Sequence, residues 1–571
     1  MKHKILISVA ALALAAHLLM GFAFIKSAAP TYDEPVHLSS GYSYLATGRY
    51  IMNIMDHPPL SEMASALPLL CYRPSIFSNH TYFMGALPYH YGDLFLYQNV
   101  VDAEKMLNAA RVFSFILWGA VFAVFIGLFA FKTAGFEAAV FSVAAFALLP
   151  VFISNNALVT TDAAPAAFYF ASFCLGCMFA RIEPLTATLR GHKVIKVLDN
   201  KKHYRYAALT GLATGLAMAS KFSMFVLPPL VIGMWILHNI LEPKIRLPRL
   251  LWYAAVYLAA ALLTLAVVYK FDLALYFDGL RETFKRLDQG RSSFIWGTHS
   301  IKGVWWYFPV ALTIKTPVAA LLLAFTGLAV SLKRFKKEHL WLLLPPLCYF
   351  ASASFTRVQI GFRHIMPVMP FLAVFAGLGA AYLKEKKALL WVFVPLIFLW
   401  IWGLARTGPY YLEYFNELAG GPKNGYKYLV DSNLDWGQGI KPLGSYLKER
   451  GNPPVILSYF GVAKPEYYGI KYFPLKGGLA NVEINGTGED LCALKRPLLA
   501  VSATNLQGVY FPDRGVFDWL KKRKPLFTAG YSIFLYDLTG DKEGLDRLSD
   551  IFDSQGLNRE ADCLRGRIKD E

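Results

Sequence analysis

Residues 5 to 25 read ILISVAALALAAHLLMGFAFI, an apolar run as long as the roughly 20 residues that a helix needs to cross a membrane. Lys2 and Lys4 precede the run and KSAAP follows it at 26–30, which would also suit a cleaved signal peptide. The apolar core is longer than most signal-peptide cores, so we interpret the run as an uncleaved anchor. Under both interpretations the residues that follow it face away from the cytoplasm.

Similar runs recur as far as residue 405. The chain has 571 residues, of which 56% are hydrophobic and only 17% charged, whereas a soluble domain of this size carries nearer a quarter charged residues. The composition therefore indicates an α-helical polytopic membrane protein with about 11 transmembrane helices. Runs long enough, or nearly so, lie near 5–25, 110–130, 136–154, 164–181, 205–219, 222–240, 251–269, 311–331, 339–353, 364–383 and 388–405.

The basic residues indicate which ends of these runs face the cytoplasm. The formal net charge is +18, and Lys and Arg gather in short loops between the runs. Examples are RGHKVIKVLDNKKHYR (190–205), KIRLPR (244–249), KRFKKEH (333–339) and KEKK (384–387). This bias is typical of cytoplasmic loops. No basic stripe alternates with exposed aromatic residues, so we expect no nucleic-acid partner.

Four regions are then expected on the outer side of the membrane. They are a long first loop at 26–109, the short stretch NNALVTTDAA at 155–164, the loop 270–312 and a tail from about 406.

The tail differs from the rest of the chain in its pattern. Strand-like runs at 454–462, 496–503 and 531–538 alternate with a helix-like run at 439–451. This pattern predicts a small α/β domain outside the membrane. We therefore expect a membrane domain at 1–405 and an extracytoplasmic α/β tail domain at 406–571, which ends in a helical segment that caps it.

Ionisable residues gather near the outward ends of the apolar runs. Ten of them come from six separate segments: Asp33, Glu34, His37, Asp56, His57, Asp162, Lys221, Lys315, Arg363 and His364. Taken singly they have ordinary explanations, since Asp33 and Asp162 could begin helices and Lys221 could mark a helix end. Carboxylates and cations side by side at one face are costly unless they pair or bind a ligand, so we expect a functional cluster.

Such a cluster suits the transfer of a group from a phosphate. A carboxylate can take the proton of a hydroxyl group while cations neutralise a phosphate leaving group. Nucleotide-activated donors are absent outside the cytoplasmic membrane, so a transferase there needs a donor carried by a lipid.

Five segments, taken in order, carry a resemblance to a known family. They are TYDEPVHLSSGYSYLATGRY (31–50) with DHPPL (56–60), VTTDAAPAAFYF (159–170), GLATGLAMASKFSM (211–224), WWYFPVALTIKTP (305–317) and GFRHIMPVMPFLAVFAG (361–377). The series resembles the GT-C superfamily of glycosyltransferases, in particular the family-39-like group. That group includes protein O-mannosyltransferases and the aminoarabinose transferases that modify lipid A. DSNLDWGQG at 431–439 also resembles a segment of bacterial members with outward tails.

The resemblance implies a GT-C-type fold over 1–405 and a glycosyltransferase that uses a polyprenyl-phosphate-linked sugar in an inverting single displacement. Asp33 would be the general base, Glu34 would orient it or the acceptor, and Asp162 would be a second acidic residue of the site. Arg363 would bind the donor phosphate, with help from Lys221, Lys315 and His364. His57, beside His37, would shape the first loop.

The resemblance leaves the metal, the acceptor and two other functions open. No cofactor is expected, although a divalent ion held by Asp33, Glu34 and Asp162 stays open. The acceptor would be a hydroxyl group of a lipid, a glycan or a protein, although no segment resembles the extra β-trefoil domain of the eukaryotic protein mannosyltransferases. Alternatives are a ligase or polymerase of surface polysaccharide and a secondary transporter for an anionic solute.

The expected location is the inner (plasma) membrane, spanned several times, with the site and the tail on the extracytoplasmic side. For DSNLDWGQG we favour Asx turns at Asp431 and Asp435 over a role in acceptor binding.

Overall fold

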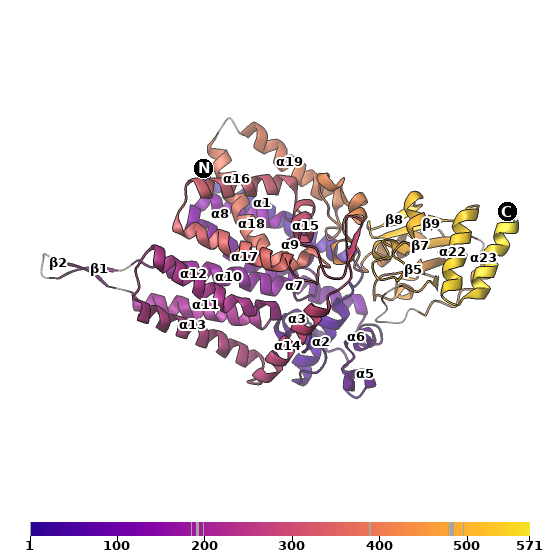
Figure 1. The fold of residues 1–571 in the computed structure, drawn as a ribbon, viewed down its shortest axis with the longest axis horizontal. Helices are drawn as coiled ribbons and strands as arrows, with labels where there is room; N and C mark the ends of the chain where they lie inside the picture. Colours follow the sequence, from indigo (N-terminus) through magenta and orange to yellow (C-terminus); the bar gives the residue numbers. More distant parts are fainter. Residues whose placement is uncertain are drawn as a thin grey trace.

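The computed structural model describes residues 2–183, 185–189, 193–197, 199–386, 390–477, 479, 485–494 and 496–570. A long helical part is followed by a smaller sheet domain at the C-terminal end (Figure 1). The α-helices of the helical part are α1 (Lys2–Ser27), α2 (Glu34–Thr47), α3 (Pro59–Ala66), α4 (Leu69–Tyr72), α5 (Thr81–Met84), α6 (Pro88–Tyr97), α7 (Ala103–Ala134), α8 (Phe136–Ala147), α9 (Pro150–Asn155), α10 (Ala163–Ala180), α11 (Asn200–Met218), α12 (Leu227–Leu241), α13 (Leu247–Val268), α14 (Leu273–Gln289), α15 (Tyr307–Lys315), α16 (Val318–Lys333), α17 (Leu340–Ser354), α18 (Met369–Glu385) and α19 (Leu390–Thr407).

Each of the predicted apolar runs coincides with a helix or a pair of helices, except that 388 and 389 lie outside the described residues. Within the described part, six helices are long and apolar enough to cross a membrane, or seven if α15 and α16, bent by 111°, are one span. The helical membrane fold is thus confirmed, but this measure gives fewer spans than the predicted eleven. The other runs form helices that are shorter or less apolar: Pro150 divides 136–154, and charged residues lie in the first turns of α11.

Small residues let the membrane helices approach closely. A Cβ atom added at Gly379 of α18 would lie 2.0 Å from the carbonyl oxygen of Leu323 in α16. One added at Gly327 of α16 would lie 1.9 Å from the carbonyl oxygen of Phe375. Backbones packed through glycine in this way gain van der Waals contact, which replaces the hydrophobic driving force that the bilayer does not supply.

The tail contains a five-stranded sheet in the order β6 (Tyr472–Pro474), β5 (Val455–Ser458), β7 (Leu498–Ser502), β9 (Ile533–Asp537), β8 (Phe527–Ala529). β5 pairs with β6 and β7 in parallel, and β9 pairs with β7 and β8 antiparallel. The predicted strands correspond to β5, β7 and β9, and the predicted helix to α20 (Ile440–Lys448). Alternate residues of β5 face opposite sides of the sheet. Val455 and Leu457 pack against α20, and Ile456 packs into the hydrophobic core on the other face.

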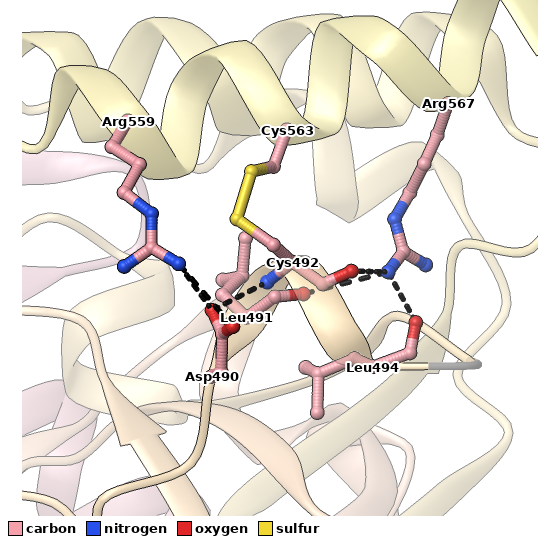
Figure 2. The surroundings of a disulfide bond; sticks show 7 residues. All are labelled: Asp490, Leu491, Cys492, Leu494, Arg559, Cys563 and Arg567. Atoms are coloured by element: carbon pink, nitrogen blue, oxygen red, sulfur yellow. Dashed lines mark hydrogen bonds and ion pairs between the residues drawn. A yellow bond between two sulfur atoms is a disulfide. The ribbon is translucent and has the colours of Figure 1, made fainter.

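A helix pair, α22 (Lys542–Ser554) and α23 (Asn558–Asp570), closes the chain beside this sheet (Figure 1). A disulfide between Cys492 and Cys563 fastens α23 to the sheet domain, and Arg559 and Arg567 bind the same segment on either side (Figure 2). The predicted cap is therefore held covalently, which the sequence analysis did not foresee.

The tail docks on one end of the helical part. Backbone N–H groups of Ala29 and Tyr32 donate to the carbonyl oxygens of Gln438 and Trp436, at 3.1 and 2.9 Å. The basic segment with β1 (Leu185–Leu189) and β2 (Lys193–Val197) lies at the opposite end of the molecule (Figure 1). Tail and basic segment therefore occupy opposite ends, as the distribution of charge predicts.

Candidate active site

Asp33 occupies the N-cap position of α2, directly after the turn that leaves α1. Its Oδ2 atom lies 3.2 Å from Nη2 of Arg363, which belongs to the 3₁₀ helix η3 (Phe362–Val368). The Asp33 side chain is 22% exposed, whereas that of Asp162 is 1% exposed. Asp33 is therefore the carboxylate of this pair that a bound molecule can reach.

Arg363 also binds a second carboxylate. Its Nη1 lies 3.2 Å from Oδ2 of Asp162, just before α10, and Oδ1 of Asp162 accepts a hydrogen bond from Nζ of Lys221 at 2.6 Å. Burial alone would raise the pKa of Asp162, but the charges of Lys221 and Arg363 hold it below the usual value. Asp33, Arg363, Asp162 and Lys221 thus form one line of ion pairs, named here the ion-pair chain.

The tail forms one wall of the ion-pair chain. Nε of Arg363 lies 3.2 Å from Oγ of Ser432, and its guanidinium lies 4.0 Å from the ring centre of Trp436. Both residues belong to DSNLDWGQG, so this segment contacts the site directly. Its carboxylates reach mainly across the tail, because Asp431 accepts from the hydroxyl of Tyr510 and Asp435 from the backbone N–H of Thr504. Asx turns are therefore an incomplete description of this segment.

A second guanidinium lies near Asp33. Nε of Arg291, in the loop after α14, donates to the hydroxyl of Tyr510 at 3.3 Å. Within the described part of the chain, no carboxylate lies within 4.0 Å of Arg291, although the charges of Asp431 and Asp33 raise its pKa against the effect of burial. The sequence predicts that this loop lies on the outer side, but no motif marks Arg291 as a residue of the site.

Glu34 does not join the ion-pair chain. Its carboxylate is fully buried against Arg111 of α7, with Nε of Arg111 at 2.8 Å from Oε1, and it also accepts backbone N–H groups of Thr31 and Val159. Burial would raise the pKa of Glu34, but Arg111 and these hydrogen bonds lower it. Glu34 therefore has a structural position: its hydrogen bonds connect the turn that contains Asp33 to the loop before Asp162. An isolated Arg near the start of an apolar run was the signal for such a partner.

The two histidines of the first loop lie beside the ion-pair chain. Nδ1 of His37 is 2.8 Å from Oε1 of Glu62, and the His57 ring lies 5.0 Å from the His37 ring. His57 also contacts Thr161, whose Oγ1 is 3.2 Å from its Nδ1. Burial lowers the pKa of both rings, but Glu62 reverses the effect for His37, whereas the charges of His37 and Lys221 deepen it for His57. No motif in the sequence marks Glu62, so its contact with His37 was not predicted.

Lys315 lies apart from the ion-pair chain. Its ammonium donates to the carbonyl oxygens of Leu412 and Asn433, at 2.7 and 2.6 Å. A cavity of about 10 Å³, space for one water, has Lys315 and Arg363 in its lining. Lys315 therefore connects α15 to the tail. His364, in contrast, lies close enough to Asp162 for the two groups to interact electrostatically.

Each carboxylate of the site that was expected to share a metal ion binds a cationic side chain. Among the residues that the structure describes, no three His, Cys, Asp or Glu side chains could hold a metal ion. Asp33 pairs with Arg363, Asp162 pairs with Lys221, and Glu34 pairs with Arg111. The three carboxylates expected to share one metal ion therefore pair with three different side chains.

No protein-family model matches this chain, and no curated protein matches it. Solved structures resemble it at low identity. ArnT from Cupriavidus metallidurans bound to undecaprenyl phosphate is 13% identical, over 92% of this chain and 97% of that one, with a TM-score of 0.48. The same protein in the apo state is 12% identical over the same shares, with a TM-score of 0.49. The archaeal oligosaccharyltransferase AglB from Archaeoglobus fulgidus, in complex with an inhibitory peptide and a dolichol-phosphate, is 12% identical over 86% of this chain and 62% of that one, with a TM-score of 0.47.

Proposed function

We propose that this chain is a membrane glycosyltransferase that moves a sugar from a polyprenyl-phosphate-linked donor to a hydroxyl acceptor, on the extracytoplasmic side of the membrane. The observation that carries the proposal is the ion-pair chain. Four residues from distant segments meet at the end of the helical part, and the accessible carboxylate, Asp33, shares the guanidinium of Arg363 with the enclosed carboxylate of Asp162. A base beside a phosphate-binding cation is the pair of groups that such a transfer requires.

The donor phosphate would bind at Arg363. A guanidinium can bind phosphate through two parallel hydrogen bonds, which an ammonium cannot do. Asp162, held by Lys221 at 2.6 Å, keeps Arg363 in position, so the phosphate takes the place of the more exposed Asp33. Donor binding thereby releases Asp33 from its ion pair and makes its carboxylate free to accept a proton.

The transfer is then a single displacement. Asp33 takes the proton of the acceptor hydroxyl as the acceptor oxygen bonds to the anomeric carbon. The bond from that carbon to the phosphate oxygen breaks, its electron pair stays on the phosphate, and polyprenyl phosphate leaves beside Arg363 and Lys221. Attack from the face opposite the phosphate inverts the configuration of the sugar.

Two features support an extracytoplasmic site. The tail that walls the site carries a disulfide, and disulfides persist in oxidising compartments outside the cytoplasm. The basic segment around β1 and β2 lies at the other end of the molecule, where the charge rule places the cytoplasm (Figure 1).

The test is to incubate the purified full-length protein with a panel of polyprenyl-phosphate sugars and to measure release of polyprenyl phosphate. Asp33→Asn should lower the turnover rate about a hundredfold or more, which is the contribution expected of a general base. The variant should still bind the donor. Glu449→Gln, on the exposed end of α20, is the matched control and should keep full activity. A variant Asp33→Asn as active as the parent would exclude Asp33 as the base.

A further inference from the structure

An open groove of about 700 Å³ lies apart from the ion-pair chain, between α4 and the beginning of α7. Cys71 and Tyr72 of α4 belong to one wall, and a stripe of α7 from Glu104 to Ile116 forms the other. Arg111, buried against Glu34, lies on a different face of α7. The groove is therefore separate from the site described above.

The α7 wall becomes less polar along its length. One row of side chains at helical spacing consists of Lys105, Asn108, Val112 and Ile116. The row begins with a charged side chain, continues with an amide and ends with two aliphatic side chains. It extends over about 17 Å at 1.5 Å per residue. α7 is one of the helices able to cross the membrane, so the apolar end of the groove lies toward the hydrocarbon and Lys105 toward the interface.

The polar end of the groove has an available positive charge. The Lys105 ammonium lies 5.3 Å from the ring centre of Tyr72 and, within the described ranges, no carboxylate lies within 4.0 Å of it. The two nearest acidic residues in the sequence have partners other than this ammonium. Asp102 accepts from the hydroxyl of Tyr467 at 2.6 Å and from the backbone N–H of Lys105 at 2.9 Å. Glu104, which also lines the groove, has its charge balanced by Lys441 of the tail at 2.6 Å.

We propose that this groove binds one acyl chain of an anionic phospholipid, with the headgroup at Lys105 beside Tyr72. Charge at the polar end complements an anionic headgroup, and Lys and Tyr are residues typical of the membrane interface. The apolar stripe covers the chain, and the volume of the groove falls in the range of small-molecule sites. The site is independent of the proposed transfer reaction.

Cys71 offers a reporter inside the groove, because it is a free and exposed thiol. The experiment uses the full-length Cys348→Ser protein in detergent micelles, since Cys348 is the other exposed free thiol in the described part. The rate at which a maleimide modifies Cys71 is measured while phosphatidylglycerol or phosphatidylcholine is added. Phosphatidylglycerol should protect Cys71 at a concentration about fivefold lower than phosphatidylcholine does. This is the difference in affinity expected from one lysine next to an anionic headgroup.

Two variants test the assignment. Lys105→Gln should abolish the difference between the two lipids, and Ala109→Trp, which fills the groove, should make modification of Cys71 independent of lipid. The matched control carries the reporter at Val100→Cys in a Cys71→Ser background, where the thiol is exposed outside the groove and lipid should not protect it.

Three results would overturn the proposal: equal protection by both lipids, an unchanged preference in Lys105→Gln, or protection of Val100→Cys to the same degree. Protection of Cys71 without added lipid, confined to a dimeric fraction, would show that a second protein copy covers the groove instead.

Discussion

At the scale of single residues, the proposal depends on how Arg363 divides its guanidinium between two carboxylates. Lysine at this position keeps the charge but cannot hold Asp162 and a phosphate through separate N–H groups in one plane. We therefore expect Arg363→Lys to raise the donor KM about 10- to 100-fold, the value of charged hydrogen bonds, with a smaller change in kcat. Initial rates at varied donor concentration measure this, and Lys384→Arg, on an exposed pair with Glu137, is the control. An unchanged donor KM would mean that the phosphate binds elsewhere.

Glu34 illustrates a different role for a carboxylate next to the base. Glu34→Ala leaves Arg111 buried without its partner, which should lower the free energy of unfolding by about 3 to 5 kcal/mol. Thermal unfolding of the detergent-solubilised protein measures the change. Glu137→Ala breaks an exposed pair with Lys384 and should cost no more than about 1 kcal/mol. Equal effects of the two substitutions would show that the buried pair does not support the fold.

At the scale of elements, the segment DSNLDWGQG holds the tail against Arg363 and contains an acid with an unusual titration. Burial, assisted by the charge of Asp431, raises the pKa of Asp435 to about 8, although hydrogen bonds from Thr504 lower it. An unfolded Asp releases its proton near pH 4. Between these two values the folded state binds more protons than the unfolded state, so stability falls as the pH rises from about 4 to about 8.

Asp435→Asn should weaken this dependence, because the amide stays neutral at every pH. We expect the melting temperature of the parent to fall between pH 5 and pH 8 by more than that of the variant. Glu413, whose pKa burial raises to about 7, contributes the same slope in both proteins. Asp546→Asn, exposed on α22, should behave as the parent does. Parallel pH profiles for the parent and Asp435→Asn would contradict a raised pKa at Asp435.

At the scale of the whole molecule, the disulfide lies in a different part of the tail from the segment that contacts the site. The ion-pair chain contacts the tail at Ser432 and Trp436. Cys492 and Cys563 instead join the outer helix of the tail, α23, to the sheet domain (Figure 2). Replacing both cysteines by Ser should lower the stability of the tail by about 2 to 4 kcal/mol, because the unfolded chain loses a constraint. Turnover at low temperature should not change.

Limited proteolysis of the tail and release of polyprenyl phosphate, measured on the same preparation, separate these two effects. Cys348→Ser is the control, since this thiol lies outside the tail. Loss of turnover at a temperature where the tail is intact would mean that the outer helix acts on the site.

Prediction from sequence succeeded where one short stretch carries the signal. The runs around β5, β7 and β9 show their alternation within a few residues. Asp33, Asp162, Lys221 and Arg363 lie far apart in the chain, but each lies next to its own apolar run, so their position at one end of the spans could be predicted segment by segment. Prediction failed where a partner lies far away in the chain. The resemblance implied that Glu34 orients Asp33 or the acceptor, but its side chain faces Arg111, 77 residues further on.

The sequence by itself determined that this chain is a helical membrane protein with an α/β tail, and at which end of the helices its polar residues gather. Hydropathy and charge act additively along the chain, so they can be summed without coordinates. Only the tertiary structure decided which cation each carboxylate binds, that Ser432 and Trp436 enter the site, and that Arg291 approaches Asp33. An ion pair depends on the direction and burial of two side chains, and packing between distant segments sets both.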